Sequence, residues 1–576
     1  MSPVQRLFRI YAWPYRWSFL AGAFFLGLTN YLTVSIPEQI GLAIDHLSDG
    51  KAMDHVLTIA WMGASIIVVR TLSRVLFFNP GRDIEHGIRR DLFSHLLALQ
   101  PTFYATHNRG DIISRASNDI SWTRVMVGFG GLQLVNVCFA LTLTCWKMFD
   151  ISPFLSLAAL APIAVGFVIV NIVIRRLYPL MRQNQEELAR ISEHVLESFQ
   201  GVATIQGFVA EAAFQKEFDE RNGQWFRTGL RLAVLRSIFA PLIGLCAGGS
   251  VAALLYFGGP MVVQGELSVG DLAAFVALIA TLVPYMRSIG WMLSVWQRGI
   301  ASLDRIFELL DAPVERTEGD SPVSLEAGRG PGIGLHGLSF AYPDEPEKDV
   351  LHDISLQVPP GTTVGVFGRT GSGKSTLLQL LSRTHAPEKG MLRVDGEDIR
   401  NLDIFAWRRR LSTVPQRPFL FSDSIAANIS LQDGVSEQAL SEVVGLASLS
   451  QDLPAFPDGL DTVVGERGIM LSGGQRQRVA LARGLYQNGD LILLDDVLSA
   501  VDHENEARLV QTLSKLSKGE RKLTCFIVSN RISAFRYTDF VMVLEEGRLV
   551  RCAPHADLVK EEGVYRESYL AQRETA

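Results

Sequence analysis

The chain has 576 residues, 48% of them hydrophobic, and its mean hydropathy is positive at +0.19. This length predicts more than one domain, and the formal net charge of −6 argues against a protein that binds nucleic acid through a general basic field. The five cysteines include no CxxC pair, so we expect neither a disulfide framework nor a cysteine metal site. The segment 1–17 is basic and aromatic and has no A-x-A cleavage pattern, and we interpret it as a cytoplasmic interface segment that leads into a retained first span.

Six stretches are apolar and long enough to cross a bilayer, which requires about 20 residues. Arg70 and Arg74 interrupt the second stretch and Arg287 the sixth. Such charges usually face the interior of a helix bundle or a water-filled cavity, so three roles stay open: an ion pair in the bundle, an arginine at the interface, and a place in a substrate path. The stretches are roughly 17–43, 56–79, 127–149, 153–175, 236–259 and 268–296.

The arginines of this half are concentrated in two long links, one between the second and third stretches and one between the fourth and fifth. The positive-inside rule therefore predicts a multi-pass protein of the cell (inner) membrane, with the long links and both termini in the cytoplasm. Both links have helical periodicity, with breaks at 108–111 and near 201–207. Each break either presents a short helix to a cytoplasmic domain or is an ordinary helical hairpin.

After Ala312 the composition changes to that of a soluble α/β protein. We predict a membrane domain at 1–312, a linker rich in Gly, Ser, Pro and charge at 313–332, and a nucleotide-binding domain at 333–576. Residues 361–381 combine an apolar strand, a glycine-rich turn and a helix, and they fit the P-loop pattern G-x-x-x-x-G-K-[ST]. The strand before the turn and the helix after it favour a true nucleotide-binding site over a chance match.

The P-loop predicts phosphate binding because its backbone N–H groups surround the phosphates at a helix N-terminus. Lys374 is expected to reach the β- and γ-phosphates, and the Ser375 hydroxyl is expected to bind Mg²⁺. A second apolar strand, 490–496, ends in acid, and Asp495 is the expected magnesium partner at the carboxyl edge of the sheet. The predicted phosphate-binding residues are Gly368, Arg369, Thr370, Gly371, Ser372, Gly373, Lys374, Ser375 and Thr376.

A further string, MLSGGQRQRVALARGL, lies between these two elements at 470–485. Ser472, followed by Gly473, Gly474 and Gln475 at a helix start, forms another anion-binding nest. The P-loop of this chain does not need it, since that loop already holds its own phosphates. We therefore predict that two such domains face each other and that each completes the site of the other.

With this string the chain resembles the ATP-binding cassette (ABC) exporters, and the resemblance covers nearly its whole length. LSGGQ is the signature motif of that family. The resemblance implies an α-helical membrane domain of six helices, type I exporter-like, joined to an α/β P-loop NTPase cassette, and one such half implies a dimer. It also implies that Tyr342 stacks on adenine and that Gln416 touches Mg²⁺ and relays to the membrane helices. The remaining family elements are an X-loop at 464–468, a D-loop at 499–502, and coupling helices near 108–120 and 201–213.

Two positions depart from the family pattern. Asp495 corresponds to the family's Walker B aspartate. Most active cassettes have Glu as the general base at the next position, but this chain has Asp496, which is one methylene shorter. A misplacement of about 1 Å can cost on the order of 100-fold in rate. The family usually has a switch-loop His at the γ-phosphate, but this chain has Asn530, which can donate a hydrogen bond and cannot titrate. Because of these two changes, we predict a degenerate ATP site in this chain. Because LSGGQ is intact, we predict that it completes a competent site in a partner subunit.

We therefore expect a subunit of an ATP-driven exporter that moves amphipathic or hydrophobic compounds by alternating access, resembling the Mdl-type, multidrug-resistance-like heterodimers. ATP and Mg²⁺ are the expected cofactors. A second half-transporter, the lipid bilayer and a small amphipathic substrate are the expected partners, and nucleic acid is not. Two alternatives stay open: an active homodimer, and a dedicated exporter of a lipid, a peptide or a siderophore. The six spans exclude a soluble cassette protein, and their fusion to the cassette disfavours an importer.

Overall fold

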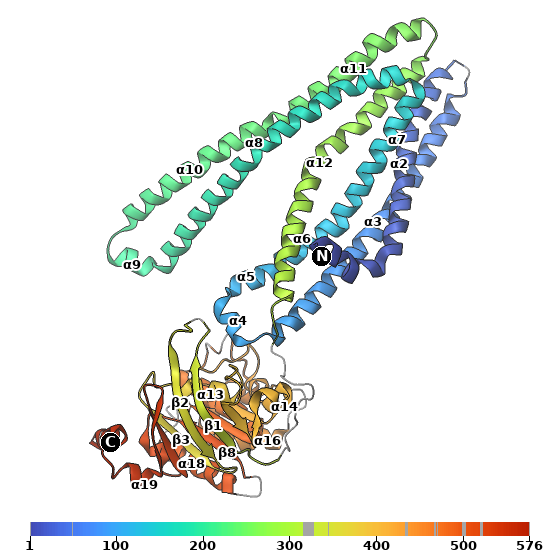
Figure 1. The fold of residues 1–576 in the computed structure, drawn as a ribbon. Helices are drawn as coiled ribbons and strands as arrows, with labels where there is room; N and C mark the ends of the chain where they lie inside the picture. Colours follow the sequence, from blue (N-terminus) through green and yellow to red (C-terminus); the bar gives the residue numbers. More distant parts are fainter. Residues whose placement is uncertain are drawn as a thin grey trace. The chain divides into compact units, whose positions relative to one another are not determined.

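The structure is a computed structural model that describes residues 2–48, 50–314, 328–343, 345–431, 436–465, 468, 470–497, 503–518 and 522–574. The chain forms two compact units (Figure 1). One unit contains Met1–Leu97 and Gly110–Ala312, and the other contains Ala98–Arg109 and Pro313–Ala576. Most of the predicted linker, the predicted D-loop at 499–502, and residues 466 and 467 of the predicted X-loop lie outside the described residues. These elements stay predictions.

Long helices make up most of the first unit, and each predicted apolar stretch falls mainly on one of them. Among the described residues, five helical stretches are long and apolar enough to cross a membrane. The fourth predicted stretch corresponds to a shorter apolar segment, Pro153–Ile169. The long helices are α2 (Arg16–Asp45), α3 (Ala52–Ala98), α7 (Gly131–Ile151), α8 (Pro153–Gln200), α11 (Phe239–Val263) and α12 (Val269–Leu310).

Short helices occupy both predicted breaks in the long links. α4 (Pro101–Thr106) ends just before the first break, and α5 (Arg109–Ser114) begins inside it. At the second break, α9 (Val202–Gly207) follows α8, and α10 (Glu211–Ser237) then runs back along α8 (Figure 1). The other helical segments are α1 (Pro3–Leu7), η1 (Phe8–Ala12), η2 (Trp13–Tyr15), η3 (Arg115–Asp119), α6 (Ile120–Val125) and η4 (Met126–Gly130).

Of the three arginines that interrupt the second and sixth predicted spans, two have side chains that the structure describes. Arg70 and Arg74 are both exposed on α3. Neither residue forms an ion pair within the described part of the chain, and the three roles considered for these arginines stay predictions. The side chain of Arg287 lies outside the described residues.

Helix α2 is held at one end to α12 and α7. A Cβ atom on Gly270 would lie 2.2 Å from the carbonyl oxygen of Gly41, so glycine is required where the two helices touch. The Gly270 N–H also donates to Asp45 Oδ1 at 2.8 Å, which satisfies a donor at the start of α12. An ion pair of 2.6 Å between Glu38 and Lys147 joins α2 to α7. These contacts bind the three helices together.

The predicted first coupling segment is attached to α12 near the other end of that helix. Asp119 is 3% exposed, accepts a hydrogen bond of 2.9 Å from Ser302 Oγ, and forms an ion pair with Arg305. Arg115 forms a second ion pair, of 2.6 Å, with Glu308. Because a buried carboxylate needs its partners, these contacts fix the segment to α12.

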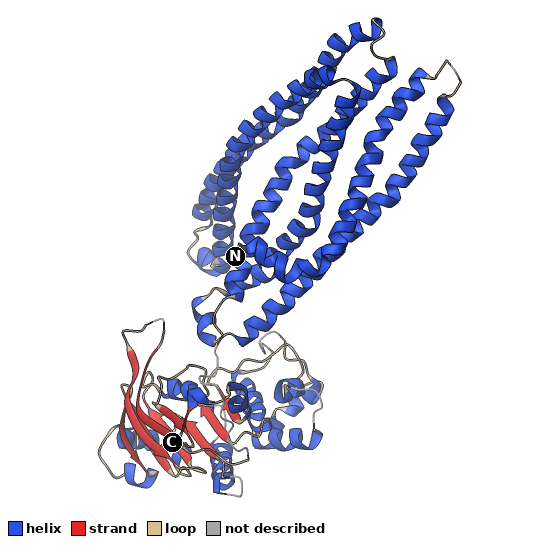
Figure 2. Ribbon diagram, turned by 45° about the vertical axis from the view of Figure 1, so that its right-hand side comes forward, coloured by secondary structure: helices blue, strands red, loops and turns tan. Residues whose placement is uncertain are grey.

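The second unit is built on two sheets, and Figure 2 shows that its strands are flanked by helices and loops. The larger sheet has the order β10-β9-β3-β8-β7-β6, and it is parallel except for β10. The smaller sheet is antiparallel, with the order β2-β1-β4-β5. The strands are β1 (Ile333–Ala341), β2 (Asp349–Val358), β3 (Thr363–Gly368), β4 (Leu392–Val394), β5 (Glu397–Asp398), β6 (Leu411–Val414), β7 (Leu491–Asp495), β8 (Thr524–Val528), β9 (Phe540–Glu545) and β10 (Arg548–Ala553).

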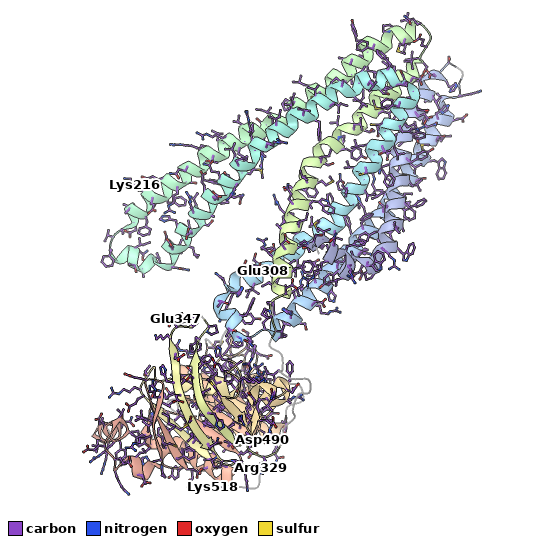
Figure 3. All side chains as sticks on the ribbon, viewed as in Figure 1. Lys216, Glu308, Arg329, Glu347, Asp490 and Lys518 are labelled. Atoms are coloured by element: carbon purple, nitrogen blue, oxygen red, sulfur yellow. The ribbon has the colours of Figure 1, made fainter. Side chains whose placement is uncertain are left out.

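Buried charge and apolar packing position the central strands. Asp490, labelled in Figure 3, directly precedes β7 and pairs with the buried Arg410 at 3.0 Å. All residues of β3 are buried, as expected for a parallel strand covered on both faces.

The predicted fold class, a helical membrane domain followed by an α/β cassette, is confirmed. The cassette helices are α13 (Lys374–Leu381), α14 (Ile404–Arg409), α15 (Ile425–Ser430), α16 (Glu437–Leu446), α17 (Gly473–Tyr486), α18 (His503–Lys518), α19 (His555–Leu558) and α20 (Val564–Glu574), with 3₁₀ turns η5 (Ile399–Asn401), η6 (Leu449–Gln451), η7 (Leu453–Ala455), η8 (Gly459–Asp461) and η11 (Ile532–Phe535).

Candidate nucleotide-binding site

The predicted P-loop connects the buried strand β3 to helix α13. Gly373 has a φ of +89°, and a Cβ atom there would lie 2.4 Å from Leu351 Cδ2. A Cβ atom on Gly368 would lie 2.4 Å from both Leu544 O and Ser372 Oγ. Both glycines are therefore required by the path of the chain, which delivers the loop to the N-terminus of α13. A turn of this kind directs backbone N–H groups at an anion.

Lys374 lies across this loop. Its amino group donates to the carbonyl oxygens of Gly368 at 2.7 Å and Arg369 at 2.9 Å. Partial burial lowers the pKa of Lys374, while the nearby carboxylates of Asp496 and Asp495 act in the opposite direction. The loop thus holds a cationic group beside the place where phosphates are expected.

Asp495 ends strand β7 and faces the start of α13. Ser375 Oγ donates to Asp495 Oδ1 at 3.1 Å. Burial raises the pKa of this carboxyl, the Ser375 hydrogen bond lowers it, and the neighbouring Asp496 raises it further. Gln416 lines the same pocket. A hydroxyl, a carboxylate and an amide oxygen are the ligands that a hard divalent cation prefers, so this set suits Mg²⁺.

Asp496 occupies an unusual backbone conformation. Its φ is +51°, in the left-handed region that Asp tolerates better than most residues, and its N–H donates to Val528 O at 3.0 Å. Asp496 Oδ2 accepts long hydrogen bonds from Gln416 Nε2 at 3.4 Å and Asn530 Nδ2 at 3.3 Å. The structure therefore brings together the two positions that depart from the family pattern, although they lie far apart in sequence.

The residues that line this pocket come from β2, the P-loop with the start of α13, the ends of β7 and β8, and the loops after β6 and β8. They include most of the predicted phosphate and magnesium residues together with Asp496 and Asn530. The described lining is Val350, Thr370, Gly371, Ser372, Gly373, Lys374, Ser375, Thr376, Gln416, Asp495, Asp496, Val528 and Asn530.

Tyr342 lies beside α13 and has its own contacts there. Its hydroxyl is 2.9 Å from Thr376 Oγ1 and donates to Gln379 Oε1 at 3.0 Å. Its ring makes edge-to-face contacts with Phe340 and with His385, at centroid distances of 5.3 and 5.2 Å. The aromatic residue is thus attached to the helix that follows the P-loop. Stacking on adenine stays a prediction.

The LSGGQ string begins helix α17 and forms a capping box. The Gln475 N–H donates to Ser472 Oγ at 3.2 Å, and the Ser472 N–H donates to Gln475 Oε1 at 2.9 Å. A Cβ atom on Gly473 would meet nothing within 4 Å, so the packing of this chain does not require that glycine. None of Ser472, Gly473, Gly474 and Gln475 is among the described residues that line the P-loop pocket. Among the described residues, the LSGGQ string therefore lies outside the pocket that the P-loop lines, and its binding of phosphate stays a prediction.

Two contacts near the pocket were not predicted from the sequence. Gln477 Nε2, on α17, donates to Gln416 O at 3.2 Å. Gln572, on the C-terminal helix α20, bonds to the loop that carries Asn530. Each contact joins segments that are distant in sequence, and no local motif indicates either one.

Comparison with known proteins identifies relatives of the whole chain. The family model described as ABC transporter transmembrane region matches residues 19–286, and the model described as ABC transporter matches residues 351–499. The chain is 31% identical to the probable multidrug resistance ABC transporter ATP-binding/permease protein YheI of Bacillus subtilis, over 94% of this chain and 93% of that protein. It is 31% identical to the multidrug resistance-like ATP-binding protein MdlA of Escherichia coli, over 99% and 97% of the two chains.

A third relative has a lipid in its name. The ATP-dependent lipid A-core flippase of Pseudomonas fluorescens is 30% identical over 94% of this chain and 88% of that protein. Among solved structures, a bacterial Atm1-family ABC exporter with ATP bound matches with a TM-score of 0.78 at 24% identity, covering 97% of this chain and 98% of that one. That structural match concerns the fold alone.

Proposed function

The chain belongs to the ABC transporter family, and on that premise we propose that it is one subunit of a heterodimeric exporter whose own ATP site is degenerate. The type I exporter fold and the ABC ATPase cassette make it a membrane transporter that couples ATP hydrolysis to export, of the multidrug or lipid A type. The observation that carries the proposal is the meeting of Asp496 and Asn530 in the P-loop pocket.

Asp496 is poorly suited to act as a general base. Its carboxylate is one methylene shorter than glutamate and accepts long hydrogen bonds from Gln416 and Asn530. General bases contribute about 10²–10⁴-fold to a rate, and only when they reach the proton that they remove. Asn530 can donate a hydrogen bond to a γ-phosphate but carries no positive charge. The site therefore binds ATP and hydrolyses it slowly or not at all.

The remaining residues of the pocket suit ATP retention. Lys374 and the P-loop N–H groups would hold the phosphates, while Ser375, Asp495 and Gln416 would hold Mg²⁺. The metal neutralises phosphate charge when bound. Each of these residues is of the type expected in an active cassette, so the proposed defect concerns hydrolysis and spares binding.

The intact LSGGQ string would serve the partner subunit. Ser472 begins helix α17 with its capping hydrogen bonds formed, and the space beside Gly473 is open. A second cassette facing this one could place its ATP phosphates there, at the positive end of the helix. ATP at both sites would bring the cassettes together and switch the membrane helices outward. Hydrolysis at the partner's site would then release them, with the cassettes on the cytoplasmic side of the cell membrane.

The experiment that tests this proposal is ATP hydrolysis by the purified chain without a partner. We expect ATP to bind with normal affinity and to turn over slowly. Robust turnover by a homodimer would instead support the alternative in which both substitutions are tolerated. The control is Asp496→Asn, which removes the residual carboxylate and should change a slow rate very little.

The cargo is a separate question, and we propose amphipathic or hydrophobic compounds. Relatives at comparable identity include proteins named for multidrug resistance and a protein named as a lipid A-core flippase, so a dedicated lipid exporter is the second candidate. Inverted vesicles that contain the chain and its partner can be assayed with a panel of dyes and with labelled lipids. Transport of several unrelated dyes supports the first candidate, and transport confined to one lipid class supports the second.

A further inference from the structure

Two hydrogen bonds from helix α20 hold the loop that carries Asn530. Gln572 Nε2 donates to the carbonyl oxygen of Asn530 at 2.8 Å, and Gln572 Oε1 accepts from the Ile532 N–H at 2.9 Å. One side-chain amide therefore spans the loop on both sides of Arg531. Because the amide is planar, its two hydrogen bonds fix the loop in orientation as well as in position.

The helix that supplies Gln572 is anchored in the cassette core. Tyr565, also on α20, is 3% exposed, and its ring lies 5.0 Å from that of Phe367 in β3 and 6.3 Å from that of Phe535 in η11. The Tyr565 hydroxyl is 2.8 Å from His555 Nδ1. Tyr565 thus fixes helix α20 in the cassette core. Because the helix is fixed, the exposed Gln572 amide can hold the loop in place.

The clamped loop leads directly into the P-loop pocket. Strand β8 ends at Val528, and the Arg531 N–H donates to Ser529 Oγ at 3.0 Å. The Asn530 side chain lines the pocket beside Ser375 and donates to Asp496 Oδ2. A shift of the Asn530 backbone would therefore move the side-chain amide that faces the nucleotide.

We propose that Gln572 is a positioning residue: through the loop, α20 holds Asn530 where it meets the terminal phosphate of ATP. The C-terminal helix thereby sets the preference of this pocket for a nucleoside triphosphate over a diphosphate. The inference rests on the proposed role of Asn530 at the γ-phosphate. It does not depend on whether the site hydrolyses ATP.

The test compares the affinities of the full-length chain for Mg-ATP and Mg-ADP. Gln572→Met keeps the length of the side chain and removes both hydrogen bonds. Losing the hydrogen bond from Asn530 to the terminal phosphate should weaken ATP binding on the order of threefold to tenfold. We expect this fall in the affinity for Mg-ATP only. The affinity for Mg-ADP should stay unchanged within about twofold, because ADP is held by the P-loop. Arg573→Met places the same side chain one position along the exposed end of α20 and should change neither affinity.

A double-mutant cycle decides whether Gln572 acts through Asn530. Asn530→Ala alone should reduce the ATP preference, and adding Gln572→Met to that background should reduce it no further, because coupled residues are non-additive. Equal losses for ATP and ADP, additive effects, or no effect of Asn530→Ala would each overturn the inference.

A second variant covers the case in which Gln572→Met does not fold. Gln572→Asn keeps the amide but shortens its reach by one methylene, and the same selective loss of ATP affinity is expected. All of these readouts are binding affinities. Robust ATP turnover by the native chain would therefore remove the degenerate-site proposal and leave this one intact.

Discussion

Restoring the family residues at both divergent positions should convert this chain into an active ATPase. The perturbation is Asp496→Glu together with Asn530→His in the chain without its partner. A misplacement of about 1 Å costs on the order of 100-fold, and a well-placed general base contributes about 10²–10⁴-fold. Because the P-loop, Asp495 and LSGGQ are already present, we expect a gain of about 100-fold in kcat.

The same substitution carries a predictable cost in stability. Residue 496 has a φ of +51°, and Glu tolerates the left-handed region less well than Asp does. Such a conformation costs an L-residue about 1–2 kcal/mol in general, and replacing Asp by Glu adds only part of that. Domains are stable by about 5–15 kcal/mol, so the variant stays folded. A slightly lower unfolding temperature should therefore accompany the faster hydrolysis.

The assay is phosphate release by the purified chain in nanodiscs, with its dimeric state checked by light scattering. The control adds Lys374→Ala, which removes the P-loop cation and should abolish the gained activity, so that a contaminating ATPase is excluded. If the dimeric double variant binds ATP normally and hydrolyses it no faster than the native chain, Asp496 and Asn530 are not the cause of slow turnover. The degenerate-site argument would then fail.

Three further predictions concern single residues. Ser472→Ala, in the complex with the partner, should strongly reduce total ATP hydrolysis and weaken ATP binding to this chain's pocket much less, as photolabelling of each subunit would show; an equal loss of hydrolysis on Asp496→Asn would contradict the assignment. Burial raises the pKa of Asp495 in the folded chain, so the protonated carboxyl favours folding. This contribution to stability is fully present below the pKa of the unfolded chain and is lost as the pH rises through the higher folded pKa. Asp495→Asn should therefore raise the unfolding temperature of the nucleotide-free protein at pH 7 while weakening Mg²⁺-dependent ATP binding, and a lowered unfolding temperature would refute this. Asp119→Asn removes the ion pair to Arg305 and should lower substrate transported per ATP in vesicles more than the ATPase rate, whereas equal losses would show a general folding defect.

The parts of the fold that follow local rules could be predicted from the sequence. The P-loop is recognisable because its glycines, lysine and serine are adjacent and lie between an apolar strand and a helix. The break near 108–111 and the start of α17 likewise depend on neighbouring residues. Hydropathy located the membrane helices, and the fourth stretch was the weakest of them, because only Pro153–Ile169 passes as an apolar helix among the described residues.

The contacts that refine the site could not be predicted, because they join distant segments through ordinary residues. The left-handed backbone at Asp496 depends on its N–H reaching Val528 in the neighbouring strand. Tyr342 was predicted to be an aromatic residue at the nucleotide, but its edge-to-face contact with His385 depends on how β1 and α13 pack. An amide such as Gln572 carries no signal in sequence, since glutamine is common on exposed helices. Only the packing of Tyr565 explains why this amide meets the loop.

Helix α17 connects the two roles assigned to this chain. Ser472 and Gln475 stand at its first turn, where the partner's nucleotide would bind, and Gln475 Nε2 donates to Asp452 Oδ1 at 3.3 Å. Two residues further along the same helix, Gln477 donates to the backbone of Gln416, whose side chain reaches Asp496 in the P-loop pocket. If the proposed phosphate binds at the N-terminus of α17 and shifts this short rigid segment, the hydrogen bond from Gln477 would pass the shift to Gln416. In the proposed heterodimer, binding at the partner's site and retention of ATP in this chain would therefore be coupled through one helix, and by linkage the coupling would act equally in both directions.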